Sequence, residues 1–393
     1  MKLPKGFTAS GVEAGLKKGR PDVALIVAEE GASAAALFTR NLFLAAPVVL
    51  SKASLKKSRG RVRGVVVNAG CANAVTGAEG MAAASRVQEA ASGLLGCRPE
   101  EVFVASTGVI GVVLPDELVR GALPGAVAGL SASGLEAVSR AILTTDVGPK
   151  VAEASFAWNG RKGRVVGVAK GAGMIHPNMA TMLAFLMTDA PASPPFLREV
   201  LAGATEESFN AISVDGDTST NDTVLLLASG QLGGPAMTSR AEAQGFVRAV
   251  TKVCRDLAWM IVRDGEGAAR VMEIDVRGAR SARDAKLAAH AVATSPLVKT
   301  ALAGGDPNWG RILAAVGRSG ARFSPSRTSL TAGCLKLVER GMPLPYSERA
   351  AARIFLGERV PLLISLGSGP GRAKLLSCDL GHAYVTLNAD YRS

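Results

Sequence analysis

The chain has 393 residues, enough for about two or three domains, and its 48% hydrophobic and 20% charged residues exclude a disordered chain. The net charge of +12 favours anionic partners: nucleic acids, phosphorylated cofactors or carboxylate substrates. No apolar run reaches the roughly 18 residues of a membrane-spanning helix, and residues 1–7 lack the apolar stretch of a signal peptide.

Short β-branched runs alternate along the chain with Ala-rich segments of helical character. Strands are expected at Val23–Val27, Val65–Val67, Val102–Val104, Val165–Val168, Met182–Met187, Val224–Leu227, Leu362–Leu366 and Tyr384–Leu387. Helices are expected at Ala82–Leu95, Leu135–Leu143, Pro195–Phe209, Arg240–Arg263 and Asp284–Val292. The mixture predicts an α+β, layered α/β fold in which helices sandwich β-sheets. We place a domain boundary at Gly278–Ser281, which separates residues 1–280 from a smaller α/β unit at 281–393.

The densest basic stretch runs from Lys52 to Arg63 and holds no aromatic residue. Proteins that bind nucleic acid usually add aromatic platforms or a recognisable module. A solvated helix end and turn before the apolar strand at residues 64–67 is therefore favoured. We expect no nucleic-acid partner and no membrane partner.

Metal and redox chemistry have little support in the sequence. The five cysteines are scattered, form no C-x-x-C pair, and are typical of reduced, mostly buried thiols in a cytoplasmic protein. The three histidines lie far apart, which argues against a zinc site. We expect no metal and no tightly bound cofactor.

Two loops imitate ligand sites. Residues 367–371 (GSGPG) follow a strand as a dinucleotide loop would, but no helix follows, so a turn between strands is favoured. Residues 214–222 (VDGDTSTND) resemble a calcium loop, but Leu226 stands where the closing glutamate would be. A turn held by its own Asp, Ser and Thr side chains is the better prediction.

The most informative segment runs from Lys170 to Phe185 and reads KGAGMIHPNMATMLAF. Taken alone, it favours a hairpin or crossover that leads into a strand beginning at Thr181. It also permits another chemistry, because a strained Ala180–Thr181 peptide can be attacked by the Thr181 hydroxyl. The freed Thr181 would carry a nucleophilic hydroxyl and its own base, an α-amine with a pKa of about 7.7–8.0.

Several segments, in order along nearly the whole chain, resemble the self-cleaving acetyltransferases of arginine biosynthesis, also called ornithine or glutamate N-acetyltransferases. The segment from Lys170 to Leu183 resembles the cleavage motif of that family. The other matching segments are residues 67–74, 105–111, 144–146, 214–222, 264–268, 306–311 and 388–391.

The resemblance implies a role for particular residues. Ala180 would end the upstream chain and Thr181 would be the nucleophile, giving mature chains 1–180 and 181–393 with an N-terminal-nucleophile-like active site. Thr107 and Gly108 match the pair that forms the oxyanion hole. The substrate-binding positions of the family fall on Thr144, Lys170, Thr181, Glu266, Asn388 and Ser393. Ser393 departs from the pattern, because family members more often end in threonine.

The implied substrates explain these residue types. Ornithine and glutamate share an α-amine and an α-carboxylate but carry opposite charges at the far end. A pocket for both needs Lys170 to meet a carboxylate and Glu266 to meet an ammonium. Without the resemblance, both would be interpreted as surface charges beside glycine turns, and Asn388 as a turn residue at a strand end.

The resemblance thus implies ping-pong transfer of an acetyl group from N2-acetylornithine to glutamate through acetyl-Thr181. Some family members also acetylate glutamate with acetyl-CoA, and the sequence leaves that open. The implied assembly has two copies of each chain. One alternative is an N-terminal-nucleophile amidohydrolase or aminopeptidase-like enzyme with water as acceptor. Another is a basic binding protein in which the glycine motifs are only turns.

Overall fold

The computed structural model describes residues 1–176 and 182–390. Ala180, Thr181, Ser393 and the predicted cleavage point therefore lie outside the described residues. The chain forms two compact units. The first contains residues 1–210 and 217–261, and the second contains residues 211–216 and the described residues from 262 onward.

The first unit is built on one large sheet, which has eight strands among the described residues. Its strands are β1 (Phe7–Val12), β2 (Val23–Phe38), β3 (Arg61–Cys71), β4 (Val102–Val109), β5 (Lys150–Trp158), β6 (Arg161–Lys170), β7 (Leu183–Thr188) and β9 (Thr223–Ala228). Its helices are α1 (Ala46–Lys57), α2 (Gly77–Leu95), α3 (Asp116–Ala128), α4 (Leu135–Ala141), α5 (Pro194–Glu206) and α6 (Gln244–Arg263).

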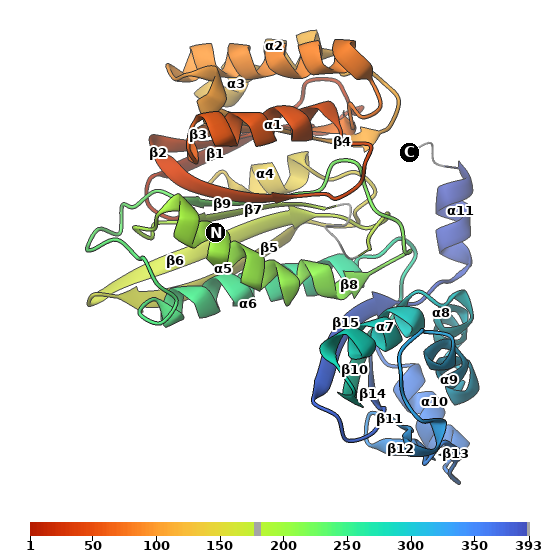
Figure 1. The fold of residues 1–393 in the computed structure, drawn as a ribbon. Coiled ribbons are helices and arrows are strands. Elements are labelled where there is room, and N and C mark those ends of the chain that lie inside the picture. Colours follow the sequence, from red (N-terminus) through yellow and green to blue (C-terminus); the bar gives the residue numbers. More distant parts are fainter. Residues whose placement is uncertain (177–181, 391–393) are drawn as a thin grey trace. The chain divides into compact units, whose positions relative to one another are not determined.

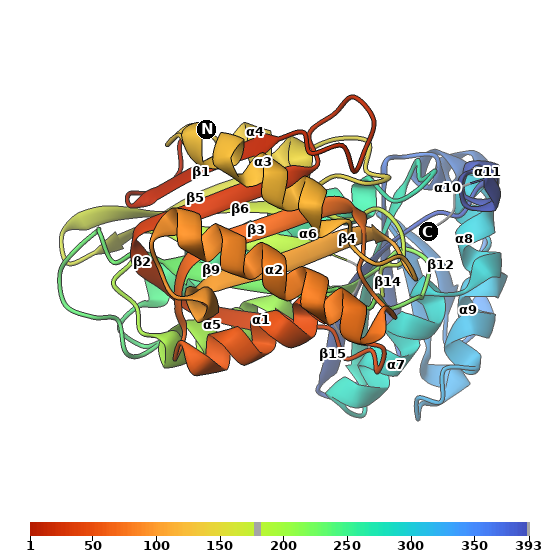
Figure 2. The same ribbon diagram turned by 90° about the horizontal axis from the view of Figure 1, so that it is seen from above.

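The long strand β2 divides this sheet into two layers. The strand order is β4-β3-β2-β9-β7-β6-β5, with β1 beside β2. Residues 23–27 of β2 pair with β1 and β3, the register shifts before Ala32, and residues 33–38 pair with β9. Figure 1 shows the two resulting layers, with α1, α2 and α3 outside one and α5 and α6 outside the other. Figure 2 shows α1 and α2 side by side over their layer.

Alternation along the strands explains the two layers. In β2, Ala24 and Ile26 belong to the core that also holds residues of β6, β7 and β9, whereas Val23 and Leu25 pack toward α2 and α3. Because successive side chains of a strand point to opposite faces, a fully apolar run of this kind must be covered on both sides. The predicted layered α/β class is confirmed.

The second unit holds a second sheet with the strand order β13-β12-β11-β14-β10-β15-β8. Its strands are β8 (Ile212–Ser213), β10 (Val271–Ala279), β11 (Ser329–Ala332), β12 (Leu335–Glu339), β13 (Met342–Pro343), β14 (Arg359–Ser365) and β15 (Gly371–Cys378). Its helices are α7 (Ala282–Ala293), α8 (Pro296–Ala303), α9 (Trp309–Gly317), α10 (Glu348–Phe355) and α11 (His382–Asp390).

Helices α7 to α10 pack on one face of this sheet. In β14, Val360, Leu362 and Ile364 are buried in their common core, while the residues between them are more exposed. The boundary between units differs from the predicted 280/281. Strand β10 lies inside the second sheet between β14 and β15, so the second unit begins before residue 271 and also includes β8.

One predicted element has the wrong type, because Tyr384–Leu387 belongs to helix α11 and not to a strand. Its β-branched and aromatic residues suggested a strand, but this stretch pairs with no strand and Val385 is 63% exposed. Side chains bond back to the helix instead, since Thr386 Oγ1 donates to the His382 carbonyl and Asn388 Nδ2 to the Tyr384 carbonyl.

Three smaller predictions are confirmed. The basic stretch forms the end of α1 and the turn into β3, residues 366–370 form the turn between β14 and β15, and α5 begins at a proline, Pro194. The predicted helix Arg240–Arg263 corresponds to α6, whose apolar stripe from Phe246 to Ile261 at three- and four-residue spacing is buried. None of the helices in the described part of the chain has the length and apolar character that a membrane span requires.

Candidate active site

The predicted oxyanion-hole residues lie at the carboxyl end of β4. The parallel register of β3 and β4 sets Gly108 opposite Gly70, with φ angles of +131° and +115°. A Cβ atom on Gly108 would lie 2.3 Å from the Gly70 carbonyl carbon. The two backbones can approach this closely only because position 108 is a glycine.

The preceding residue, Thr107, is 4% exposed, and its hydroxyl forms a hydrogen bond that is central to the site. The Lys170 ammonium, at the end of β6, donates to the Thr107 hydroxyl over 3.2 Å, although 63 residues separate the two in sequence. A hydroxyl that accepts from a cation keeps its own proton to donate, and the cation makes it a stronger donor. Lys170 is itself buried, so it is not the surface charge that the sequence alone would favour.

The carboxylate of Asp146 lies beside Lys170 and is fully buried. Its oxygens accept from the Gly171 N–H (2.6 Å), the Thr144 N–H (3.1 Å) and the Lys150 ammonium (2.7 Å), and one lies 3.8 Å from the Lys170 nitrogen. Burial alone would raise the pKa of Asp146. The charges of Lys170 and Lys150, together with these hydrogen bonds, outweigh burial and hold that pKa well below its usual range.

A third lysine, Lys17, lies on the far side of the Thr144 loop. Its ammonium donates to the carbonyls of Ala141 (3.1 Å) and Leu143 (2.8 Å). Burial is the main cause that lowers the pKa of Lys17 to about 8. The residues just before Thr144 are thus held by Lys17.

A second buried carboxyl, Asp222, binds the residue that directly follows Thr181, the predicted nucleophile. Its Oδ1 accepts from the Met182 N–H (2.9 Å), and the Met182 carbonyl accepts from the Thr223 N–H (3.1 Å). Burial raises the pKa of Asp222 well above its usual range, which favours the neutral acid. The start of β7 is therefore fixed from residue 182 onward.

Glu266 and Asn388 meet in the second unit. Asn388 Nδ2, on α11, donates to Glu266 Oε2 over 2.8 Å. The turn that carries Glu266 is held by Asp379, whose Oδ1 accepts from the N–H groups of Ala269 (2.9 Å) and Arg270 (3.0 Å). A Cβ on Gly267, whose φ is +69°, would lie 2.6 Å from the Tyr384 nitrogen, so the turn and the start of α11 pack closely.

The structure thus brings the described site residues together in two groups. Thr107, Gly108, Thr144 and Lys170 form the first, and Glu266 and Asn388 the second. Asp146 lies in the matched segment 144–146, which predicts no role for it, and Lys17 and Lys150 lie outside every matched segment. Spacing carries no signal for these contacts, because they join a loop, a strand end and a turn that are distant in sequence.

Other candidates give no site. In the 217–222 part of the calcium-like loop, the Asn221 N–H donates to Ser219 Oγ and Thr220 Oγ1 to Asn221 Oδ1, the predicted turn chemistry. The described residues contain no group of three or more His, Cys, Asp or Glu placed to hold a metal. Cys71 is buried as predicted, and burial raises the pKa of its thiol.

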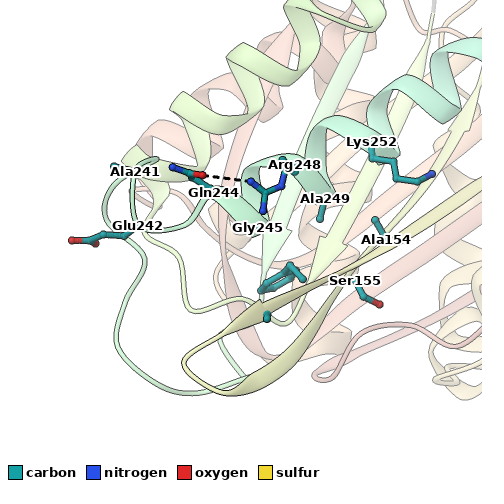
Figure 3. Close-up of a pocket in the computed structure, with 11 residues that line it drawn as sticks. Ala154, Ser155, Ala241, Glu242, Gln244, Gly245, Arg248, Ala249 and Lys252 are labelled. Atoms are coloured by element: carbon teal, nitrogen blue, oxygen red, sulfur yellow. Dashed lines mark hydrogen bonds between the residues drawn. The ribbon is translucent and has the colours of Figure 1, made fainter.

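An open pocket of about 650 Å³ lies between β5 and α6 (Figure 3). Ala154 and Ser155 line it from the strand, and Arg248 and Lys252 from the helix. Arg248 donates to Gln244 Oε1 over 3.5 Å within the helix. None of the site residues that the structure describes lines this pocket.

Comparison with known proteins identifies the family of the chain. The model of the ArgJ family matches residues 8–393. The chain belongs to the ArgJ family. An ArgJ relative from Chlorobaculum tepidum, named arginine biosynthesis bifunctional protein, is 46% identical over 390 residues, covering 99% of this chain and 96% of that protein. A relative of the same name from Symbiobacterium thermophilum is also 46% identical and covers 99% of this chain and 98% of that protein.

A solved ArgJ structure is also similar. The crystal structure of the arginine biosynthesis bifunctional protein from Bacillus halodurans matches with a TM-score of 0.51 and 38% identity. The match covers 53% of this chain and 98% of the solved chain.

Proposed function

We propose that the chain is an acetyltransferase of arginine biosynthesis that moves the acetyl group of N2-acetylornithine to glutamate. The precursor cuts itself between Ala180 and Thr181, and Thr181 then carries the acetyl group as an ester. The observation that carries this proposal is the buried hydrogen bond from Lys170 to the Thr107 hydroxyl, next to Gly108. Family membership supports it, and curated relatives are named arginine biosynthesis bifunctional proteins.

The proposed reaction has two half-reactions with balanced proton transfers. The Thr181 hydroxyl attacks the acetyl carbonyl and gives its proton to the Thr181 α-amine. The amide C–N bond then breaks, and ornithine leaves with a proton from that amine. Glutamate enters as an amine, attacks the ester, and returns the hydroxyl to Thr181 as N-acetylglutamate forms. The Thr107 hydroxyl and the Gly108 N–H would bind the oxyanion in both half-reactions, and one such donor typically contributes about 2.7–4 kcal/mol.

The charges of the site fit amino-acid substrates. Lys170 is a buried cation suited to a carboxylate, and the backbone of Thr144 is joined to it through Asp146. Glu266, which accepts from Asn388, is suited to an ammonium.

The length of the solved relative supports self-cleavage. That chain is matched over 98% of its length yet covers only 53% of this chain. Residues 181–393 make up about 54% of this chain, so the solved chain has about the length of the larger predicted fragment. We also propose that two copies of each fragment assemble, and that the enzyme works in the cytoplasm without a metal or tightly bound cofactor.

Steady-state kinetics with N2-acetylornithine and glutamate test the function. We expect release of ornithine beyond one equivalent per active site to require glutamate, and double-reciprocal plots at several glutamate concentrations to be parallel, as ping-pong transfer demands. Release of ornithine and acetate at the same rate without glutamate would identify a hydrolase instead. A parallel assay with acetyl-CoA and glutamate decides whether the chain has the second activity.

A pair of variants tests the nucleophile. Thr181→Ala should leave a single chain of 40.2 kDa without transferase activity. Thr181→Ser, which keeps a hydroxyl and an α-amine, should still be cut and active. An active, uncut Thr181→Ala protein would reject the proposal.

A further inference from the structure

We infer that Asp146 is a positioning residue for acetyl transfer: its single buried carboxylate fixes Thr144, Lys170 and the Gly171 turn in one arrangement. This inference rests on the proposed function, because Thr144 and Lys170 are the residues proposed to bind substrate. Asp146 itself needs no contact with substrate.

The chain folds so that this carboxylate can reach all three. Asp146 lies in the loop between α4 and β5, and Lys150, the first residue of β5, pairs with Ala169 of β6. Lys170 directly follows the partner of Lys150, so both lysines lie at the same end of the hairpin. The loop enters this hairpin end, where its carboxylate is 0% exposed and lies between the two ammonium groups.

Each contact of Asp146 constrains a different part of the site. The Thr144 N–H bond sets the backbone that carries the Thr144 hydroxyl. The Gly171 N–H bond, at 2.6 Å, fixes the first residue after β6 and so the exit of the chain toward residue 181. The Lys170 ion pair, at 3.8 Å, draws the ammonium to the place where it also reaches Thr107 Oγ1.

Charge balance gives Asp146 a second role. Lys17, Lys150 and Lys170 are all buried, and Asp146 affects each of them electrostatically or by direct contact. Without the carboxylate, Lys150 and Lys170 would repel each other in a region of low dielectric. Lys170 would then move from Thr107, and the oxyanion donor would lose its orientation.

The test is Asp146→Asn, which keeps the size of the side chain but removes its charge. We expect kcat/KM to fall about 100-fold, because a displacement of about 1 Å has an effect of that size. The loss should be shared between kcat and KM, with KM rising about tenfold for both N2-acetylornithine and glutamate. A purely structural role would lower only the active fraction, hence kcat, and would leave both KM values unchanged.

Asp116→Asn is the matched control. Asp116 is another buried carboxylate paired with two cations, Arg86 (2.6 Å) and Arg120 (2.8 Å), at the start of α3. The Asp116→Asn substitution should lower the unfolding temperature, while both KM values stay within about twofold of those of the wild type. Unchanged KM values in a folded Asp146→Asn protein would overturn the inference. Failure of the wild-type protein to transfer acetyl would instead reject the proposed function.

If Asp146→Asn does not fold, two further variants test the positioning role of Asp146. Asp146→Glu keeps the charge but moves the carboxylate by one methylene, and we expect at least a tenfold loss of kcat/KM. Lys150→Met removes a cation but leaves the bonds to Thr144, Lys170 and Gly171, and should stay within about threefold of wild type. A loss in folded Lys150→Met as large as in the Asp146 variants would show that only the ion pair matters, and would overturn the inference.

Discussion

The two groups of site residues differ in how the chain holds them. In the first unit, Thr107, Lys170 and Asp146 are buried, and each is held by a segment distant in sequence. In the second unit, Glu266 is half-buried and its partner Asn388 lies on α11, a helix with no buried residue. A buried, mutually bonded group resists displacement, whereas an exposed pair can adapt. The first group therefore suits the chemistry of transfer, and the second suits recognition.

The largest effect should come from removing the buried cation. Lys170→Met should lower kcat by about 10³, because it withdraws the group that bonds the Thr107 hydroxyl and leaves Asp146 partly uncompensated. The measurement is the steady-state rate of acetyl transfer. Lys162→Met, on the exposed part of the same strand, is the control and should change kcat less than twofold. Equal losses of kcat in Lys170→Met and Lys162→Met would contradict the distinction between the buried group and exposed positions.

The next effect concerns Gly108 and Gly70, the glycine pair at the proposed oxyanion hole. Gly108→Ala should reduce the free energy of unfolding by about 3 kcal/mol, because its Cβ would overlap Gly70 and its φ of +131° disfavours a side chain. Denaturant unfolding measures this. Gly121→Ala, inside α3 with no atom within 4 Å of the new Cβ, should instead stabilise by about 0.5–1 kcal/mol. Equal stability of Gly108→Ala and wild type would contradict the close approach.

The same contrast explains what the sequence could predict. Strands β2, β3 and β6 were expected because their apolar runs are buried on both faces, and the α6 stripe because its spacing is helical. The strand at Tyr384–Leu387 was wrong, because an exposed helix held by its own side-chain bonds has no apolar pattern to reveal it.

The candidate site divides in the same way. The family motifs alone predict the described site residues, which are Thr107, Gly108, Thr144, Lys170, Glu266 and Asn388. Each motif carries information only about its own stretch of sequence. The sequence does not predict the contacts of Lys17 and Asp146. These contacts depend on the β5–β6 hairpin and on a loop that folds back onto α4. No local pattern encodes such contacts between distant segments.

A smaller effect is expected at the exposed pair. Asn388→Ala should raise the KM for N2-acetylornithine about three- to tenfold through a less well oriented Glu266, with little change in kcat. The unfolding temperature should stay close to that of wild type, since α11 buries no residue. Thr386→Ala, which loses only a bond within the helix, is the control. A loss confined to kcat would place Asn388 with the transfer chemistry and end the distinction between the groups.

An effect of a different kind is a pH dependence of stability from Lys17. Its pKa is about 8 in the folded chain and 10.5 in its ordinary state, so between these values the unfolded chain binds more protons. Wild-type stability should therefore rise, relative to Lys17→Met, as the pH increases from 8 to 10.5. Denaturant midpoints of the two proteins across this range measure the difference. A difference that stays constant with pH would mean that burial does not perturb this amine.

The most direct test of the account is intact-mass spectrometry of the active wild-type protein, incubated with N2-acetylornithine but without glutamate. We predict two fragments, one ending at Ala180 and one beginning at Thr181, with the second heavier by about 42 Da, the mass that one acetyl group adds to a hydroxyl. Addition of glutamate should remove that increment. An active protein whose chain is whole, or whose Thr181 fragment never gains the acetyl group, would contradict the account.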